Sequence, residues 1–217
     1  MKNDFDVIEY QFRDSIKIIP IADMHCGSVN FNIKQWKKFK DYVLSNNDIY
    51  IVIVGDLIDN QTKNSHSPFN VSVIDVFCKL DIEDKYRPNM AFLKVQIGER
   101  NEHNRQTYTF GIIHGSGGGT LTGGAINKNE RFGYVIEGLD CLISAHVHKP
   151  AITKPSRLVV DTRNNKVSFK PFYQILATSW LDYGGYALAK QLNPSSHMHQ
   201  EIILTKERTK KLELKLR

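Results

Sequence analysis

The sequence lacks the features that mark several classes of protein. No apolar run approaches the roughly 20 residues that cross a bilayer, so a membrane-spanning protein is not expected. The first residues lack the basic-then-apolar pattern of a secretory signal. The three cysteines, Cys26, Cys78 and Cys141, are widely spaced and form no Cys-x-x-Cys pair, which argues against a disulfide framework or a thiolate zinc site. We therefore expect a cytoplasmic protein.

A strong excess of one charge is also missing. The 217 residues carry a formal net charge of +6, with 41% hydrophobic and 24% charged residues, as in ordinary globular proteins. This length predicts a single domain over residues 1–217, and no internal repeat or linker divides it. The mild positive balance slightly favours nucleotide or nucleic acid partners. The basic residues are dispersed, however, and no recognised nucleic-acid-binding motif accompanies them, so a binding module without chemistry has little support. The oligomeric state is not predicted.

The N-terminal part of the chain has the pattern of a parallel βαβ unit. Residues 15–22 and 48–54 are apolar, β-rich runs, whereas residues 32–45 place Ile33, Trp36 and Phe39 at helical spacing. Both predicted strands end directly at acidic residues. Binding sites of open α/β sheets form at the carboxyl ends of strands, so these acids are candidate functional residues.

The rest of the chain is predicted to be rich in short strands. Residues 98–105 are expected to form a hairpin turn between two alternating strands, and residues 125–136 a helix. A polar loop is expected at 60–68 and a short helix at 71–80. The predicted strands are 92–97, 106–113, 139–144, 158–162, 166–172, 174–177 and 201–204.

Acids and histidines follow four of the predicted strands. They are Asp23-x-His25, Gly55-Asp56-x-x-Asp59, His114 and His146-x-His148. Carboxylates and neutral imidazoles together suit divalent first-row metals. Two neighbouring metals share a ligand, and the carboxylate of Asp56 is the natural bridge because Gly55 permits a sharp turn. In an extended strand residues i and i+2 share one face, so each of the two i, i+2 pairs is expected to converge on one centre.

Each motif also has an ordinary structural interpretation. Asp-x-His is common in proteins, and Gly-Asp-Leu-Ile-Asp is compatible with a turn and a helix cap. The glycine run after His114 is compatible with a flexible turn or with backbone N–H groups that approach a phosphate. The order of the four motifs, each after a separate apolar strand, favours the metal site.

This ordered set resembles the calcineurin-like metallophosphoesterase family, whose pattern is D-x-H, G-D-x-x-D/N, G-N-H-D/E, H and G-H-x-H. The resemblance covers residues 16–150, with Ala145 in place of the last glycine. It implies an α/β fold, a four-layer α/β/β/α sandwich of two mixed β-sheets flanked by helices, with the C-terminal third in the second sheet. It also implies that phosphate mono- or diesters are hydrolysed by a hydroxide that two divalent metal ions activate. The family uses Mn, Fe, Zn or Ni, and we favour Mn.

The resemblance further implies how the ligands are divided. One metal would be held by Asp23, His25, Asp56 and His148, and the other by Asp56, His114 and His146. Asp59 would orient a ligating histidine.

The third block of the family pattern is not intact in this chain. In the family its Asn completes the second metal site and its His is the acid for the leaving group. The nearest string runs from Gly98 to His103, which makes Asn101 a candidate metal ligand and His103 a candidate catalytic acid. A solvent-exposed turn is the alternative interpretation. Losing a general acid commonly costs about 10²–10⁴ in rate, so a metal-binding pseudoenzyme with weak or lost turnover is the alternative to a working hydrolase.

Overall fold

The computed structural model shows most of the chain. It describes residues 5–57, 85–87, 89–100, 102–103, 105–116, 121–189, 191 and 193–217. Within these residues no helix is both long and apolar enough to traverse a bilayer. The expected loop at 60–68 and the expected helix at 71–80 lie outside the described residues.

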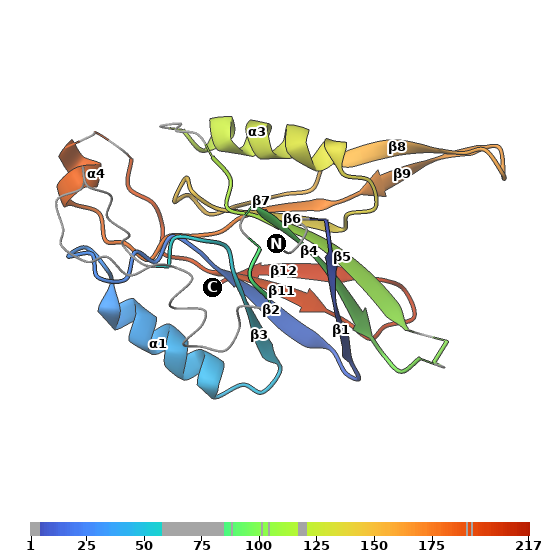
Figure 1. Cartoon of the computed structure of the whole chain (residues 1–217), viewed down its shortest axis with the longest axis horizontal. Coiled ribbons are helices and arrows are strands. Elements are labelled where there is room, and N and C mark those ends of the chain that lie inside the picture. Colours follow the sequence, from blue (N-terminus) through green and yellow to red (C-terminus); the bar gives the residue numbers. More distant parts are fainter. Residues whose placement is uncertain are drawn as a thin grey trace.

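Two mixed β-sheets lie at the centre of the structure (Figure 1). Sheet A contains, in spatial order, β1 (Val7–Phe12), β4 (Met90–Ile97), β5 (Gln106–Ile113), β6 (Cys141–Ser144), β10 (Tyr173–Leu176) and β7 (Ala151–Thr153). Sheet B contains, in spatial order, β12 (Leu212–Leu216), β11 (Gln200–Leu204), β2 (Ile16–Ile21) and β3 (Ile49–Ile53). The strands β5, β6 and β10 are parallel to one another, and so are β2 and β3.

Helices cover the outer faces of both sheets. The helix α1 (Ile33–Leu44) begins where Asn32 accepts a 2.8 Å hydrogen bond from the amide of Gln35. The helix α3 (Thr122–Val135) packs on β7 and β10 of sheet A. The short helix α4 (Gly185–Ala189) lies apart from the two sheets. The predicted βαβ unit, formed by β2, α1 and β3, is confirmed.

The alternation of apolar residues in β2 shows how the layers are held together. Ile16 and Ile18 belong to the core between the two sheets, whereas Ile19 and Ile21 pack with Phe39 of α1 on the other face. The layers are therefore α1, sheet B, sheet A and α3. The predicted four-layer α/β/β/α sandwich is confirmed.

The C-terminal third is divided between the two sheets, so the expectation that it lies in the second sheet is confirmed only for β11 and β12. The strands β7 and β10 extend sheet A, because β10 pairs in parallel with β6. The chain then crosses to sheet B, where β11 pairs with β2 and β12 forms the edge. Two further strands, β8 (Ser156–Asp161) and β9 (Lys166–Pro171), pair only with each other among the described residues.

Candidate metal centre

The ends of β2, β3, β5 and β6 bring acids and histidines to one edge of the sandwich. Backbone hydrogen bonds hold the loops after these strands together. The amide of His25 donates to the carbonyl of Asp56 at 2.9 Å, which joins the loops after β2 and β3. The amide of Ala145 donates to the carbonyl of His114 at 2.9 Å, which joins the loops after β5 and β6. The positions of the side chains are therefore fixed by the main chain.

The potential ligand atoms fall into two groups, and within each group they lie within 4.8 Å of one another. The first group contains Asp23, His25 and His148, and the second contains Asp56, His114 and His146. The structure thus separates His146 from His148, so the expectation that this pair shares one centre is wrong. The backbone is not extended at either residue, since φ is +73° at His146 and +55° at His148. Asp23 and His25 are also left-handed, but they lie in one group as expected.

Asp56 belongs to the second group and also faces the first. Its Oδ2 is 3.2 Å from Nε2 of His114 and 3.9 Å from Nε2 of His25. The preceding Gly55 has a φ of +107°, and a Cβ atom at this position would lie 2.5 Å from Nδ1 of His114. Glycine is therefore required both for the turn that presents Asp56 and for the close approach of His114.

Backbone strain is concentrated at these residues. Among the described non-glycine residues, those with a positive φ are Asp23, His25, Asp56, His146, His148, Asn165 and Gln191. The first five belong to the two groups, whose sixth member is His114. A left-handed non-glycine residue costs on the order of 1–3 kcal/mol, and such strain persists chiefly at functional sites. The conformations therefore support a functional role for the two groups.

Asp23 is a buried carboxylate with one unsatisfied oxygen. Its side chain is 0% exposed, and its Oδ2 accepts a 3.0 Å hydrogen bond from the amide of His146. Its Oδ1 receives no hydrogen bond from the described residues, and Nε2 of His148 lies 3.7 Å away. Burial raises the pKa of Asp23 to about 7, although the charge of His114 opposes this effect. A cation beside Oδ1 would remove the penalty of the unpaired oxygen.

The imidazole of His114 is oriented by the main chain. Its Nδ1 lies 2.8 Å from the carbonyl oxygen of Val54, to which it donates when protonated, so that Nε2 faces Asp56. The hydrogen bond to Asp56 raises the pKa of His114 to about 9 and lowers that of Asp56. Nδ1 of His146 lies 3.2 Å from the same Nε2. Three potential ligand atoms therefore face one point.

Burial favours the neutral form of two of the other three histidines. It lowers the pKa of His146, and it lowers that of His148 to about 4. Neutral imidazole is the form that binds a metal. Each group contains one carboxylate and two imidazoles, a donor set that fits a divalent metal ion, which would displace the proton of His114 on binding.

The structure does not bring His103 to this edge. His103 is exposed in the turn between β4 and β5, whereas His114 follows the other end of β5. Eight extended residues separate the two ends by roughly 25 Å. The antiparallel pairing of β4 with β5 therefore explains why the altered block cannot supply a leaving-group acid through His103. Asn101 and Asp59 lie outside the described residues.

Sequence reasoning missed Lys128, which carries a positive charge at the rim of the second group. Its Nζ donates to the carbonyl and the hydroxyl of Ser116, at 2.7 and 2.6 Å. Ser116 follows His114 by two residues, and the charge of Lys128 is one of the causes that lower the pKa of His146. A lysine in a helix has no motif around it, so no sequence signal distinguishes it from the other basic residues of the chain.

Sequence reasoning also missed two residues that support Asp23 from sheet A. The carbonyl of Asp23 accepts hydrogen bonds from the hydroxyl of Ser179 at 3.1 Å and from the amide of Trp180 at 3.3 Å. Both residues follow β10 and are buried. They fix the left-handed turn that begins at Asp23.

Comparison with known proteins gives matches at the level of structure only. No protein-family model and no curated protein matches the sequence. A Streptococcus pneumoniae protein described as a predicted phosphoesterase is similar, with 11% identity, a TM-score of 0.36 and coverage of 94% of this chain and 98% of that chain. Vps29 from Entamoeba histolytica complexed with zinc has 14% identity, a TM-score of 0.37 and coverage of 93% and 99%. A Thermotoga maritima protein solved by NMR has 14% identity, a TM-score of 0.33 and the same coverage.

Similarity at these identities and TM-scores carries no functional argument. The resemblance to metallophosphoesterases rests instead on the order of the motif blocks, the layers of the sandwich and the geometry at its edge. The chain has a four-layer α/β/β/α fold that presents two groups of residues that could hold metal ions.

Proposed function

We propose that this protein is a metal-dependent phosphoesterase that hydrolyses phosphate mono- or diesters at the edge formed by the ends of β2, β3, β5 and β6. The observation that carries the proposal is the position of Asp56, whose Oδ2 faces a histidine of each group. Two divalent ions, for which we favour Mn, would polarise the phosphate and lower the pKa of an attacking water.

Two hydrogen bonds to the main chain hold ligand residues of this site in place. Val54 holds the ring of His114 by its Nδ1, which leaves Nε2 for the reaction centre. The amide of His146 holds Asp23 from the opposite sheet. Ligands that are already oriented need no reorganisation when the substrate arrives, which favours catalysis.

Lys128 is suited to bind the phosphate group. Its ammonium lies on α3, beside the loop that follows His114, and it is exposed to solvent. A fixed cation there would neutralise part of the negative charge that develops on the phosphoryl oxygens. The mild positive charge of the chain slightly favours nucleotides or nucleic acids as the phosphoester.

The test is hydrolysis of bis-p-nitrophenyl phosphate and p-nitrophenyl phosphate, with Mn²⁺ added or removed and with metal counted per chain. We expect Mn²⁺-dependent turnover that His146→Ala reduces by at least about 100-fold. His103→Ala is the matched control, because it removes an exposed histidine outside the site and should leave turnover unchanged. Bound metal without turnover would indicate the metal-binding pseudoenzyme, and a protein that binds no metal would refute the proposal.

A further inference from the structure

A cavity of about 420 Å³ lies between the two sheets and reaches the candidate metal centre, where Asp56 and His114 line it. The strand β1 is at the edge of sheet A and β3 is at the edge of sheet B, and residues of both strands line the cavity (Figure 1). Its volume is within the range of roughly 300–1,000 Å³ that small-molecule sites occupy. The cavity is therefore large enough to hold part of a ligand whose phosphate lies at the metal centre.

The walls of the cavity beyond the metal centre are aliphatic. The described side chains that line it and also pack with the core between the sheets are Ile8, Val52, Val54, Ala91, Leu93 and Ile112. An aliphatic wall stabilises an apolar group by removing it from water. It offers no hydrogen bond to a polar group, whose burial there is costly. The cavity therefore selects for an apolar occupant.

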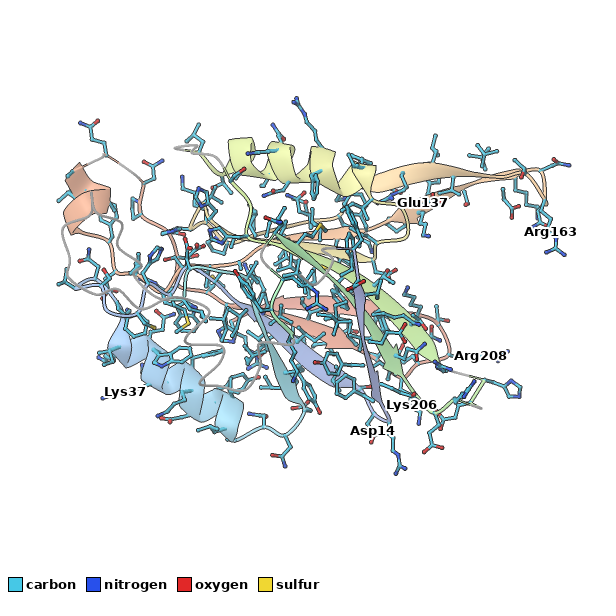
Figure 2. All side chains as sticks on the ribbon, in the orientation of Figure 1. Asp14, Lys37, Glu137, Arg163, Lys206 and Arg208 are labelled. Atoms are coloured by element: carbon cyan, nitrogen blue, oxygen red, sulfur yellow. The ribbon has the colours of Figure 1, made fainter. Side chains whose placement is uncertain are left out.

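The two sheets meet again at the far end of the cavity. Tyr10 of β1 lines the cavity, and Phe12 is the next residue on the same face of this strand. The ring centre of Phe12 lies 4.5 Å from that of Tyr50 of β3. Figure 2 shows Asp14, just after β1, at the end of the sandwich that also carries Lys206. The cavity therefore extends from the metal centre between the sheets and stops before this charged end.

Two basic residues line the cavity at the end near the metal centre. Lys85 and Arg87 precede β4, whose first residue, Met90, pairs with Ile113 directly before His114. Cations at this position attract a phosphate group and neutralise part of its charge. The cavity thus has positive charge at one end and aliphatic walls behind it. This arrangement is complementary to a ligand with an anionic head and an apolar tail.

We propose that the cavity binds an apolar ester group of the substrate, so that the substrate is a phosphoester that carries an alkyl or aryl group. The inference rests on the proposed function, because it places the phosphate at the metal centre. A water molecule takes about 30 Å³ of liquid, so a cavity of about 420 Å³ has room for a chain of roughly six carbon atoms. A nucleobase fits less well, since its polar edges would face aliphatic side chains. The cavity therefore favours an apolar ester over the nucleotides that the net charge slightly favours.

The first test is isothermal titration calorimetry of the Mn²⁺-loaded protein with hexylphosphonate and with methylphosphonate. Both compounds have a P–C bond that a phosphoesterase does not hydrolyse, so the experiment measures binding without turnover. Burial of the additional methylene groups should make hexylphosphonate bind at least about 30-fold more tightly than methylphosphonate. The metal content per chain is measured on the same samples, because the phosphonate group is expected to lie at the metal centre.

Two variants that narrow the cavity test where the chain binds. Ile8→Phe and Ala91→Leu each add carbon atoms to a wall of the cavity. Each should lower the ratio of the two affinities at least about fivefold and leave the affinity for methylphosphonate unchanged. Val7→Phe is the matched control, because Val7 is the neighbouring residue of β1, is 54% exposed and is not among the residues that line the cavity. Circular dichroism and thermal unfolding would verify that all variants are folded.

Hydrolysis gives a second measurement. The kcat/KM for p-nitrophenyl hexyl phosphate should exceed, by at least about 10-fold, the values for p-nitrophenyl methyl phosphate and for thymidine 5′-(p-nitrophenyl phosphate), which release the same leaving group. In protein that contains metal, equal affinities for the two phosphonates, an unchanged ratio in both narrowed variants or a preference for the thymidine ester would overturn the inference and leave the proposed hydrolase standing. Protein that binds no metal would refute the proposed function, and this inference with it.

Discussion

The carboxylate of Asp23 and the backbone amide of His146, 123 residues apart in sequence, are joined by a 3.0 Å hydrogen bond. Asp23 follows β2 of sheet B, and His146 follows β6 of sheet A. The contact therefore crosses between the two sheets. It holds the fully buried carboxylate of Asp23 at the point where both groups of potential ligands meet.

Asp23→Asn should reduce the stabilisation that metal gives, because it removes the carboxylate of the first group and leaves the second group intact. The wild type at a metal concentration of 100 times the dissociation constant should gain about 2.7 kcal/mol, or roughly 5–10 °C in melting temperature for a chain of this length. The variant removes the buried charge, so its metal-free form should melt no lower than wild type. Differential scanning calorimetry with and without Mn²⁺ measures both values. An equal metal-dependent rise in the variant would show that Asp23 is not a ligand.

Gly55→Ala should disrupt the second group specifically. The added Cβ would collide with the ring of His114, and the backbone there is left-handed. Gly27→Ala is the matched control, because φ is +103° but no atom lies within 4 Å of the new Cβ. Both variants should lose about 1–3 kcal/mol from backbone strain, and only Gly55→Ala should also lose metal content. Metal counts and urea unfolding would separate the two effects, and equal metal loss in both variants would contradict the prediction.

Lys128→Gln should weaken binding of the phosphate group without affecting the metal. We expect a drop of about 10-fold in kcat/KM, mostly through KM, with an unchanged metal count. Lys128→Arg should recover part of the loss. Arg131→Gln removes an exposed charge from the same helix and serves as the control. If both glutamine variants lowered kcat/KM equally, the loss would come from the reduced net charge of the chain and not from the position of Lys128.

The raised pKa of Tyr42 predicts how the stability of the protein changes at alkaline pH. Its hydroxyl donates to Oε1 of the fully buried Glu201 at 2.5 Å, and burial together with this bond raises its pKa from 10.0 to about 12. Because the folded pKa lies above the unfolded one, the stabilising contribution of the phenol is complete below pH 10 and is lost as the pH rises through 12. Tyr42→Phe should therefore be less stable than wild type at pH 8, and this difference should shrink above pH 10. Urea unfolding at pH 8 and pH 11 would measure it, and a constant difference would contradict the prediction.

Local patterns predicted the strands and helices that flank the site. The apolar run before Asp56 and the helical spacing of Ile33, Trp36 and Phe39 correspond to β3 and α1 within one or two residues. The edge strands β1, β7 and β12 were missed. β7 has only three residues, too few to show a period, whereas the alternation of β12 (Leu-Glu-Leu-Lys-Leu) was present in the sequence and was overlooked.

The composition of the site was more predictable than its geometry. Motif order identified the residues that the structure gathers into two groups, but the backbone conformation assumed for them was wrong. The i, i+2 argument assumed extended chain, whereas Asp23, His25, His146 and His148 adopt left-handed conformations. Such conformations depend on long-range contacts, such as that of Trp180 with Asp23, which no local pattern reveals.

The distribution of the ligands along the chain has a consequence for biosynthesis. Each group draws on residues that follow β2 or β3 and is completed only by His146 or His148 after β6. A nascent chain that has not yet emerged past residue 145 contains neither complete group. Metal capture at the proposed site would thus wait until the chain past β6 has been made and the two sheets have met.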